Sequence, residues 1–189
     1  MIETLTHLDV RLFLFLNSFH SAFWDKIMLF ASGKLTWLPL YIFILYMLFK
    51  KYRWNIWLAL LFVILLITLS DQVSVHFFKN VFERLRPCHN PLLTDKVYMV
   101  NNVCGGQYGF ISSHAANAFA LAIFTLLALK NKTYSYLILL WATLVSYSRI
   151  YLGRHYPGDI LTGAAVGCVL GFFVYYLMCF VFNKIQKQK

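Results

Sequence analysis

Long apolar runs dominate this sequence and restrict what it can fold into. Five of them approach the length of about twenty residues that crosses the hydrocarbon core of a bilayer. Only 13% of the 189 residues are charged and 60% are hydrophobic, whereas a soluble domain carries about 25% charged residues. We therefore predict an all-α, integral-membrane helical bundle that forms one domain over residues 1–189. Its five transmembrane helices are expected at Leu35–Phe49, Trp54–Phe78, Ser113–Leu129, Tyr134–Tyr151 and Asp159–Phe182.

The N-terminal segment, residues 1–34, has a different character. Its apolar core at Leu12–Leu16 is too short to cross a bilayer, and polar residues interrupt the rest of Val10–Phe30. An N-terminal interfacial helix or a helical hairpin fits this pattern, and a sixth, tilted span is the alternative. The stretch Met1–Asp9 contains two acids and no Lys or Arg, so we expect no cleavable signal peptide.

The distribution of Lys and Arg predicts the orientation. One side of the expected bundle carries Lys50, Lys51, Arg53, Lys130, Lys132 and the tail lysines at 184, 187 and 189. The positive-inside rule places that side in the cytoplasm, so the loop over residues 79–111 and the turn Gly153–Gly158 face outward. The net charge of +10 would also suit a nucleic-acid binder. Because the basic residues flank apolar runs, we predict that the bilayer is the partner and that nucleic acid is not.

Three polar clusters stand at the outward ends of the expected spans. Each residue alone would more often be an interfacial side chain or a helix cap. Their shared placement at one membrane face favours a single site. The clusters are Lys79-X6-Arg86-Pro87, Ser112-Ser113-His114 and Ser148-Arg149-X5-His155-X3-Asp159.

The cations and serines of these clusters predict a phosphate-binding site. Lys79, Arg86 and Arg149 would surround a tetrahedral anion, because Arg bonds two phosphate oxygens at once and Lys acts as a point charge. Ser112 and Ser113 precede an apolar run, so the free N–H groups of a helix start would add to the anion site.

The two histidines of the clusters predict a reaction rather than binding alone. Phosphoryl transfer without a metal needs a nucleophile and an acid for the leaving oxygen, and imidazole can take both roles. Asp159 is placed to orient the His155 ring, as the third member of a catalytic triad does. His89, His114, His155 and Asp159 could be imagined as metal ligands, but three nearby cations would oppose a divalent ion and no paired metal-ligand spacing occurs. We therefore expect no metal and no other cofactor.

The three clusters resemble the three-part signature of the type-2 phosphatidic acid phosphatase superfamily. That superfamily includes membrane lipid phosphatases, polyprenyl diphosphate phosphatases and soluble vanadate haloperoxidases. The resemblance covers the chain from about Asp71 to Thr162. One departure is Ile111, which stands where the second motif usually has proline. Isoleucine loses the fixed φ of proline but no catalytic group, so we expect a modest effect on loop rigidity.

The resemblance implies a role for each matched residue. Lys79, Arg86, Arg149, Ser112 and the backbone of Ser113 would bind phosphate. His155 would attack phosphorus and form a phosphohistidine, Asp159 would orient His155, and His114 would protonate the leaving group. The implied activity is the metal-independent hydrolysis of a lipid-linked phosphate or diphosphate at the bacterial inner membrane, with the active site facing the periplasm or cell exterior.

The substrate that the resemblance implies is a phosphorylated membrane lipid. Undecaprenyl diphosphate, lipid A, phosphatidylglycerol phosphate and phosphatidic acid all qualify. An outward site favours the first two, because both present phosphate on that leaflet, and we rank undecaprenyl diphosphate slightly ahead of lipid A. The alternative is a non-catalytic phospholipid-binding or transport protein. The pair of histidines with Asp159 argues against it, because pure binding needs cations but not a nucleophile and an acid.

Two further features lie beside the clusters. Asp71 falls inside the second expected span, where an acid is a candidate functional residue. It would support Lys79 or Arg86, or it would hydrogen-bond to a neighbouring helix. Cys88 and Cys104 share the outward loop, and we predict a disulfide between them if that side is oxidising.

Overall fold

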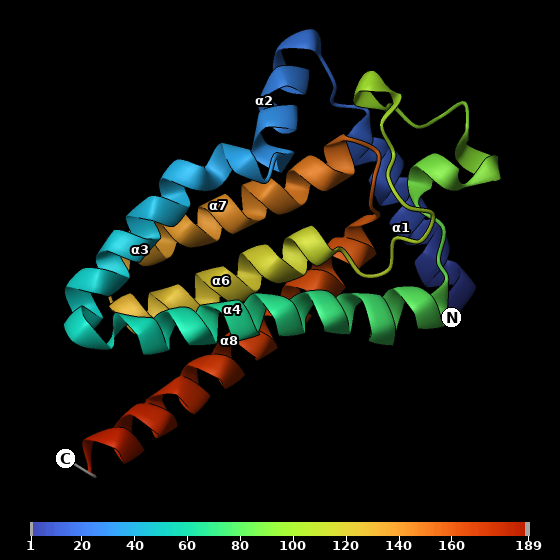
Figure 1. The fold of residues 1–189 in the computed structure, drawn as a ribbon. Helices are drawn as coiled ribbons and strands as arrows, with labels where there is room; N and C mark the ends of the chain where they lie inside the picture. Colours follow the sequence, from blue (N-terminus) through green and yellow to red (C-terminus); the bar gives the residue numbers. More distant parts are fainter. Residues whose placement is uncertain (1, 188–189) are drawn as a thin grey trace.

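The computed structural model describes residues 2–187, and in this part of the chain it contains helices and loops but no strand. Figure 1 shows the helices of the bundle side by side, with the N-terminal helices and the long loop gathered at one end. The all-α prediction is confirmed. The α-helices are α1 Ile2–Asn17, α2 Ala22–Ser32, α3 Leu38–Tyr52, α4 Ile56–Gln72, α5 Asn80–Phe82, α6 Ser113–Leu129, α7 Lys132–Tyr151 and α8 Pro157–Gln186.

Helix α6 lies at the centre of the bundle, between α7, α4 and α8 (Figure 1). It is rich in alanine, and most of these alanines are fully buried. Glycines of α8 face it: a Cβ atom at Gly163 would lie 2.7 Å from the carbonyl oxygen of Ser112, and one at Gly171 would lie 2.8 Å from that of Ala120. Gly167 lies between these two and faces Ala116, so glycines at four-residue spacing let the two helix backbones approach closely, as in membrane helix pairs.

The second predicted span, Trp54–Phe78, is part of a helical path that continues beyond Phe78. Helix α4 forms the first part of this path. It passes directly into a π-helix, η3, over Val73–Lys79, and then into α5. The helical path therefore extends to Phe82, and Lys79 lies on it rather than in the loop that was expected to begin there. Wider turns of this kind are common at functional sites, because they change the direction in which side chains point.

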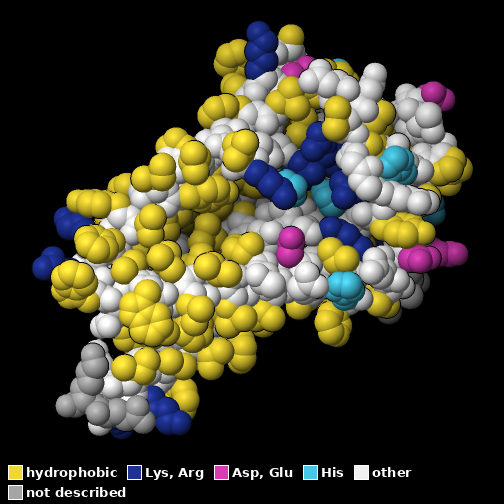
Figure 2. All heavy atoms as spheres, viewed as in Figure 1, with side chains coloured by type: hydrophobic (Ala, Val, Ile, Leu, Met, Phe, Trp, Pro, Cys, Tyr) yellow, Lys and Arg dark blue, Asp and Glu magenta, His cyan; other side chains and the backbone are white. Residues whose placement is uncertain are grey.

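The outer surface of the bundle is apolar. Trp54 is 93% exposed and Leu161 is 70% exposed, and Figure 2 shows hydrophobic side chains over the flanks of the helices. Two helical stretches, Leu35–Phe82 and Pro157–Gln186, are long and apolar enough to cross a membrane, and α6 is a shorter apolar helix. Such a surface is suited to lipid rather than water. The number of transmembrane helices stays a prediction.

The N-terminal segment forms two helices, α1 and α2, that cover the loop-bearing end of the bundle. Phe13 of α1 is fully buried. Asn17 Nδ2 donates to the carbonyl oxygens of Tyr151 at 2.8 Å and of Tyr98 at 3.1 Å. Asp25 of α2 accepts a hydrogen bond from the hydroxyl of each of these tyrosines, at 2.7 and 2.6 Å. The segment is thus tied to the ends of the helices that carry the polar clusters.

Candidate active site

A cavity of about 690 Å³ runs between α3, α4, α6 and α7. Its two parts differ in chemistry. Figure 2 shows Lys, Arg and His side chains gathered at one end of the hollow and hydrophobic side chains along the rest. The polar end is lined by Lys79, Arg86, Ser113, His114, Arg149 and His155, so residues from all three polar clusters meet there. The apolar part, which we call the apolar trough, is lined by residues such as Ile44, Leu48, Val63, Leu121 and Val145.

The three predicted cations converge from different elements. Lys79 Nζ, at the end of the π-helix, donates to Ser113 Oγ at 2.6 Å. Arg149 is 4% exposed within α7, and its Nη1 donates to Ser32 Oγ of α2. Within the described residues, Arg149 Nε is buried without a hydrogen-bond partner. A buried guanidinium with an unused donor is ready to bind an incoming anion.

Arg86 is held by the backbone of the long loop. Its Nε donates to the carbonyl oxygen of Tyr108 at 3.3 Å, and its Nη1 lies 3.5 Å from that of Cys104. Burial lowers the pKa of Arg86, and the positive charge of Arg154 lowers it further, while Asp159 partly offsets both effects. Positive charge is therefore concentrated at this end of the cavity, which favours a multiply charged anion.

The two serines of the second cluster have different surroundings. Ser112 is fully buried, its N–H donates to the carbonyl oxygen of Asp159 at 3.0 Å, and its Oγ caps α6 at the N–H of Ala115. Ser113, rather than Ser112, lines the cavity with its side chain. Ile111, in place of proline, is fully buried and follows a cis peptide bond.

His114 and His155 both line the cavity, and the structure places His155 next to Asp159 as the spacing predicted. His155 Nδ1 lies 3.6 Å from Asp159 Oδ2, which is too long for a hydrogen bond. Asp159 Oδ2 accepts a shorter bond, 2.9 Å, from the backbone N–H of Tyr156. Because Nδ1 faces the carboxylate, Nε2 is the nitrogen available to the cavity.

The environment of His155 keeps its imidazole uncharged. Burial lowers its pKa from 6.5 to about 4, Asp159 offsets part of that change, and Arg86 and Arg149 lower the pKa further. A neutral imidazole has the free lone pair that a nucleophile needs.

The acid on α4 also contributes to the cavity wall. Asp71 lines the cavity, and its Oδ1 accepts a hydrogen bond from Asn117 Nδ2 of α6 at 3.2 Å. This contact to a neighbouring helix is one of the two roles that the sequence left open.

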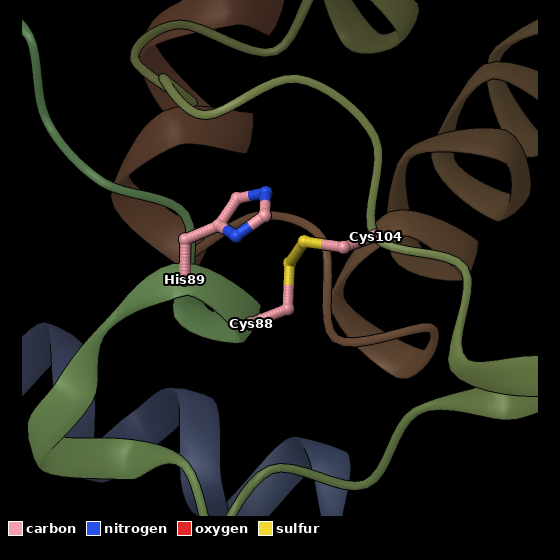
Figure 3. A group of neighbouring side chains, drawn as sticks. All are labelled: Cys88, His89 and Cys104. Carbon is pink, nitrogen blue, oxygen red and sulfur yellow. A yellow bond between two sulfur atoms is a disulfide. The ribbon is translucent and has the colours of Figure 1, made fainter.

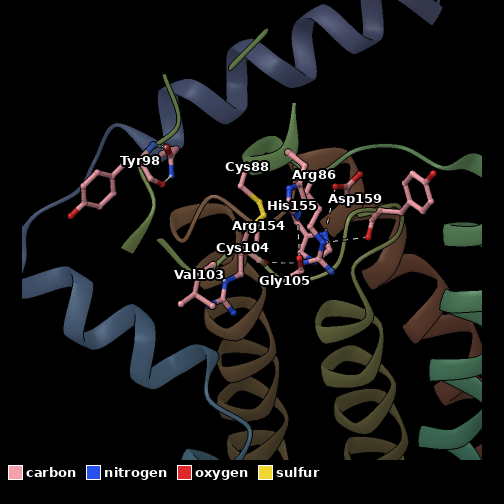
Figure 4. Close-up of a disulfide and its surroundings, with 12 residues drawn as sticks. Arg86, Cys88, Tyr98, Val103, Cys104, Gly105, Arg154, His155 and Asp159 are labelled. Carbon is pink, nitrogen blue, oxygen red and sulfur yellow. Dashed lines mark hydrogen bonds and ion pairs between the residues drawn. A yellow bond between two sulfur atoms is a disulfide. The ribbon is translucent and has the colours of Figure 1, made fainter. Parts of the chain in front are cut away.

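Cys88 and Cys104 form a disulfide in the structure, with their Cα atoms 6.0 Å apart. Figure 4 shows Arg86, His155 and Asp159 grouped beside this bridge. His89 lies next to it, with Nε2 at 3.1 Å from the carbonyl oxygen of Gly105 (Figure 3). The three side chains lie close enough together to resemble a metal site, but sulfurs joined to each other offer no thiolate to a metal.

Sequence reasoning missed two residues that touch the site. Arg84 donates from Nη1 to Asp159 Oδ1 at 2.8 Å and from Nη2 to Asp9 Oδ2 at 2.7 Å. Burial lowers the pKa of Arg84, but the carboxylates of Asp159 and Asp9 more than offset this, so the pKa lies above its ordinary value. The available signals were weak: Asp9 is an acid within α1, and Arg84 lies two residues before Arg86.

Comparisons with known proteins identify the relatives of this chain. The sequence profile described as the PAP2 superfamily matches residues 57–182. A protein named lipid A 4'-phosphatase from Bacteroides thetaiotaomicron is 44% identical over 94% of this chain and 80% of its own length. A protein of the same name from Porphyromonas gingivalis is 40% identical over 92% of this chain and 74% of its own length. An undecaprenyl-diphosphatase from Sulfolobus acidocaldarius is 31% identical over 87% of this chain and 75% of its own length.

Two solved structures have the same fold. The crystal structure of Aquifex aeolicus LpxE has a TM-score of 0.65 and 26% identity, and it covers 88% of this chain and 94% of its own. A transmembrane PAP2-type phosphatidylglycerolphosphate phosphatase from Bacillus subtilis has a TM-score of 0.69 and 23% identity, over 96% of this chain and 88% of its own. The chain therefore belongs to the PAP2 superfamily, in which it is a membrane-embedded phosphatase.

Proposed function

We propose that this protein removes the 4'-phosphate of lipid A. One observation carries the proposal: the cavity joins a cluster of cations and histidines to the apolar trough, so the phosphate and the acyl chains of one lipid can be bound at the same time. The sequence alone favoured undecaprenyl diphosphate slightly over lipid A. The two relatives at 44% and 40% identity are both named for lipid A and shift the proposal to that lipid.

The proposed reaction uses two histidines. Lys79, Arg86 and Arg149 seat the phosphate together with the Ser113 hydroxyl and the free N–H groups at the start of α6. His155 Nε2 then attacks phosphorus, a phosphorus–nitrogen bond forms, and the bond from phosphorus to the sugar oxygen breaks. His114 gives its proton to that oxygen. Water, deprotonated by His114, next attacks the phosphohistidine, which releases inorganic phosphate and restores both histidines.

Asp159 orients the His155 ring during attack. When His155 becomes bonded to phosphorus, its ring carries positive charge, and the carboxylate of Asp159 stabilises that charge through Nδ1–H. Catalytic hydrogen bonds tighten in the substrate complex, so the proposed reaction brings His155 Nδ1 and Asp159 Oδ2, which are 3.6 Å apart in this structure, within hydrogen-bond distance. Asp71 supports this arrangement indirectly, by fixing α6 against α4 through Asn117.

We also propose the membrane topology that the sequence predicts. Five spans formed by α3, α4 with its π-helix, α6, α7 and α8 place the site at the periplasmic face of the inner membrane, with the N-terminal helices at that interface. At about 1.5 Å per residue, the 20-residue α7 is about 30 Å long, which matches the hydrocarbon thickness.

Undecaprenyl diphosphate is the second candidate substrate, because the relative from Sulfolobus acidocaldarius carries that activity in its name. The same cations would bind a diphosphate, and the leaving group would then be a phosphate rather than a sugar oxygen. The two candidates differ in the leaving group that His114 must protonate, so the products separate them.

The test uses purified protein with lipid A, undecaprenyl diphosphate, phosphatidylglycerol phosphate and phosphatidic acid in mixed micelles containing EDTA. The proposal expects lipid A to lose one phosphate, assigned to the 4' position by fragment-ion mass spectrometry. His155→Ala should abolish release. Release only from another lipid would refute the substrate, and loss of activity in EDTA would refute the metal-independent reaction.

A further inference from the structure

A partly buried charge bridge connects the N-terminal helix to the catalytic carboxylate. Arg84 lies between two acids that are far from it in sequence, Asp9 on α1 and Asp159 at the start of α8. The Asp159 side chain is fully buried, and the Asp9 and Arg84 side chains are 15% and 25% exposed. The guanidinium also lies 4.1 Å from the ring centre of Tyr156. Arg84 is thus fixed on three sides.

The two oxygens of Asp159 have separate tasks. Oδ1 accepts from Arg84, and Oδ2 accepts from the backbone of Tyr156 and faces His155 Nδ1. Holding one oxygen of a carboxylate sets the plane of the group and therefore the direction of the other oxygen. Without Arg84, the Asp159 carboxylate would be held only at Oδ2 by the Tyr156 N–H, and a single contact leaves the group freer to tilt away from the imidazole.

Asp9 anchors the bridge at a second point. Its Oδ1 accepts a hydrogen bond from the backbone N–H of Gly158 at 2.7 Å, and its Oδ2 accepts from Arg84. Gly158 immediately precedes Asp159 and leaves room for this contact, because a Cβ atom there would lie 2.8 Å from Asp9 Oδ2. Asp9 therefore contacts both the backbone and, through Arg84, the side chain of the first turn of α8.

The charges of the bridge also matter. One guanidinium shared between two carboxylates leaves an excess of negative charge, whereas Arg84 paired with Asp159 alone would neutralise it. Part of the negative charge of Asp159 thus remains available to the positive charge that the His155 ring acquires when it bonds to phosphorus.

We propose that Asp9 and Arg84 are positioning residues: they orient the Asp159 carboxylate toward His155 and preserve part of its negative charge. Helix α1 is then part of the catalytic apparatus. The inference rests on the proposed phosphohistidine reaction but not on the identity of the lipid. A misalignment of about 1 Å near reacting groups can cost about 10²-fold in rate. We expect kcat to fall about tenfold in Asp9→Asn and about 10²-fold in Arg84→Gln, with KM changed less than about twofold because neither residue lines the phosphate end of the cavity.

The matched controls are Glu3→Gln, which removes another acid from the exposed surface of the same helix, and the conservative changes Asp9→Glu and Arg84→Lys. Glu3→Gln should leave kcat unchanged, and the conservative variants should recover part of the lost activity. Each substitution is repeated in an Asp159→Asn background with radiolabelled substrate. If Asp9 and Arg84 act only through Asp159, their loss should then cost less than about twofold. The same fold-loss in both backgrounds would overturn the proposal.

A second measurement needs no turnover. Nitrogen-15 NMR of His155 in detergent gives the pH midpoint of its ring, which Asp159 raises. Asp9→Asn lets Arg84 neutralise Asp159 more fully, so it should move that midpoint to lower pH, and Glu3→Gln should not. An unchanged midpoint in folded Asp9→Asn would overturn the proposed coupling between Asp9 and Asp159. If the wild type released no phosphate from lipid A, only the substrate proposal would fail, because the NMR result is independent of substrate.

Discussion

Lowering the pH from 7 to 5 should leave His155 almost entirely uncharged. Its pKa is lowered from 6.5 to about 4, chiefly by burial. At pH 5 an imidazole with the ordinary pKa would be only about 3% neutral, whereas one with a pKa of about 4 is about 90% neutral. The neutral, nucleophilic form of His155 should therefore persist about two pH units below the range in which a surface histidine becomes protonated.

The same difference links His155 to stability. Because its pKa is lower in the folded state than in the unfolded state, the free energy of unfolding is unaffected above pH 6.5 and falls as the pH drops from 6.5 toward 4. The full difference corresponds to about 3 kcal/mol. His155→Gln, which cannot be protonated, removes this dependence and leaves that of the other groups.

The assay follows both quantities in detergent. Nitrogen-15 NMR reports the ring directly, with the His155 signal assigned by its absence from His155→Gln. Thermal unfolding of wild type and variant at pH 7.5 and 4.5 reports the linked stability, and the wild type should lose more stability on acidification than the variant. A ring midpoint near 6.5, together with equal losses of stability, would refute the argument that burial controls this histidine.

Three further predictions test other parts of the structure. Leu121→Trp should raise KM for a long-chain lipid about tenfold by filling the apolar trough, but it should not change KM for a short water-soluble phosphate ester. The lipid-facing control Leu140→Trp should keep wild-type KM for both substrates, and an equal effect of Leu121→Trp on both would contradict the trough as a binding site for lipid chains. Gly171→Leu should destabilise the protein by about 1–3 kcal/mol or more in thermal unfolding, because a Cβ atom there would lie 2.8 Å from the Ala120 carbonyl oxygen. Val169→Leu on the exposed side of α8 should be neutral, and equal melting temperatures of the two variants would contradict the close packing of α8 on α6. Cys88→Ser should lower the free energy of unfolding by about 3 kcal/mol and raise KM, since the disulfide closes the loop that holds Arg86. Cys168→Ser is the control, and a wild-type KM that does not change on adding a reductant would contradict this role of the disulfide.

The sequence was sufficient to predict the helical bundle and the grouping of the three clusters. Long apolar runs have few alternatives in a membrane, and the spacing between His155 and Asp159 is local. The contacts of Ser112 were less accessible, because its hydroxyl fits both a helix cap and a phosphate ligand until the cavity lining is known. The roles of Asp9 and Arg84 could not be read from the pattern. Neither belongs to one of the three clusters, and each Arg84–Asp contact spans 75 positions of sequence.

The apolar trough has a kinetic consequence. It lies between helices whose outer faces are suited to lipid, and it leads to the cations at the polar end of the same cavity. A substrate can then diffuse sideways from the membrane into the site while its chains remain in an oily environment. The encounter takes place in two dimensions, so the rate depends on how many substrate molecules share a given area of membrane. Adding inert detergent at a constant total substrate concentration should slow the enzyme by surface dilution, even though the amount of substrate in the tube has not changed.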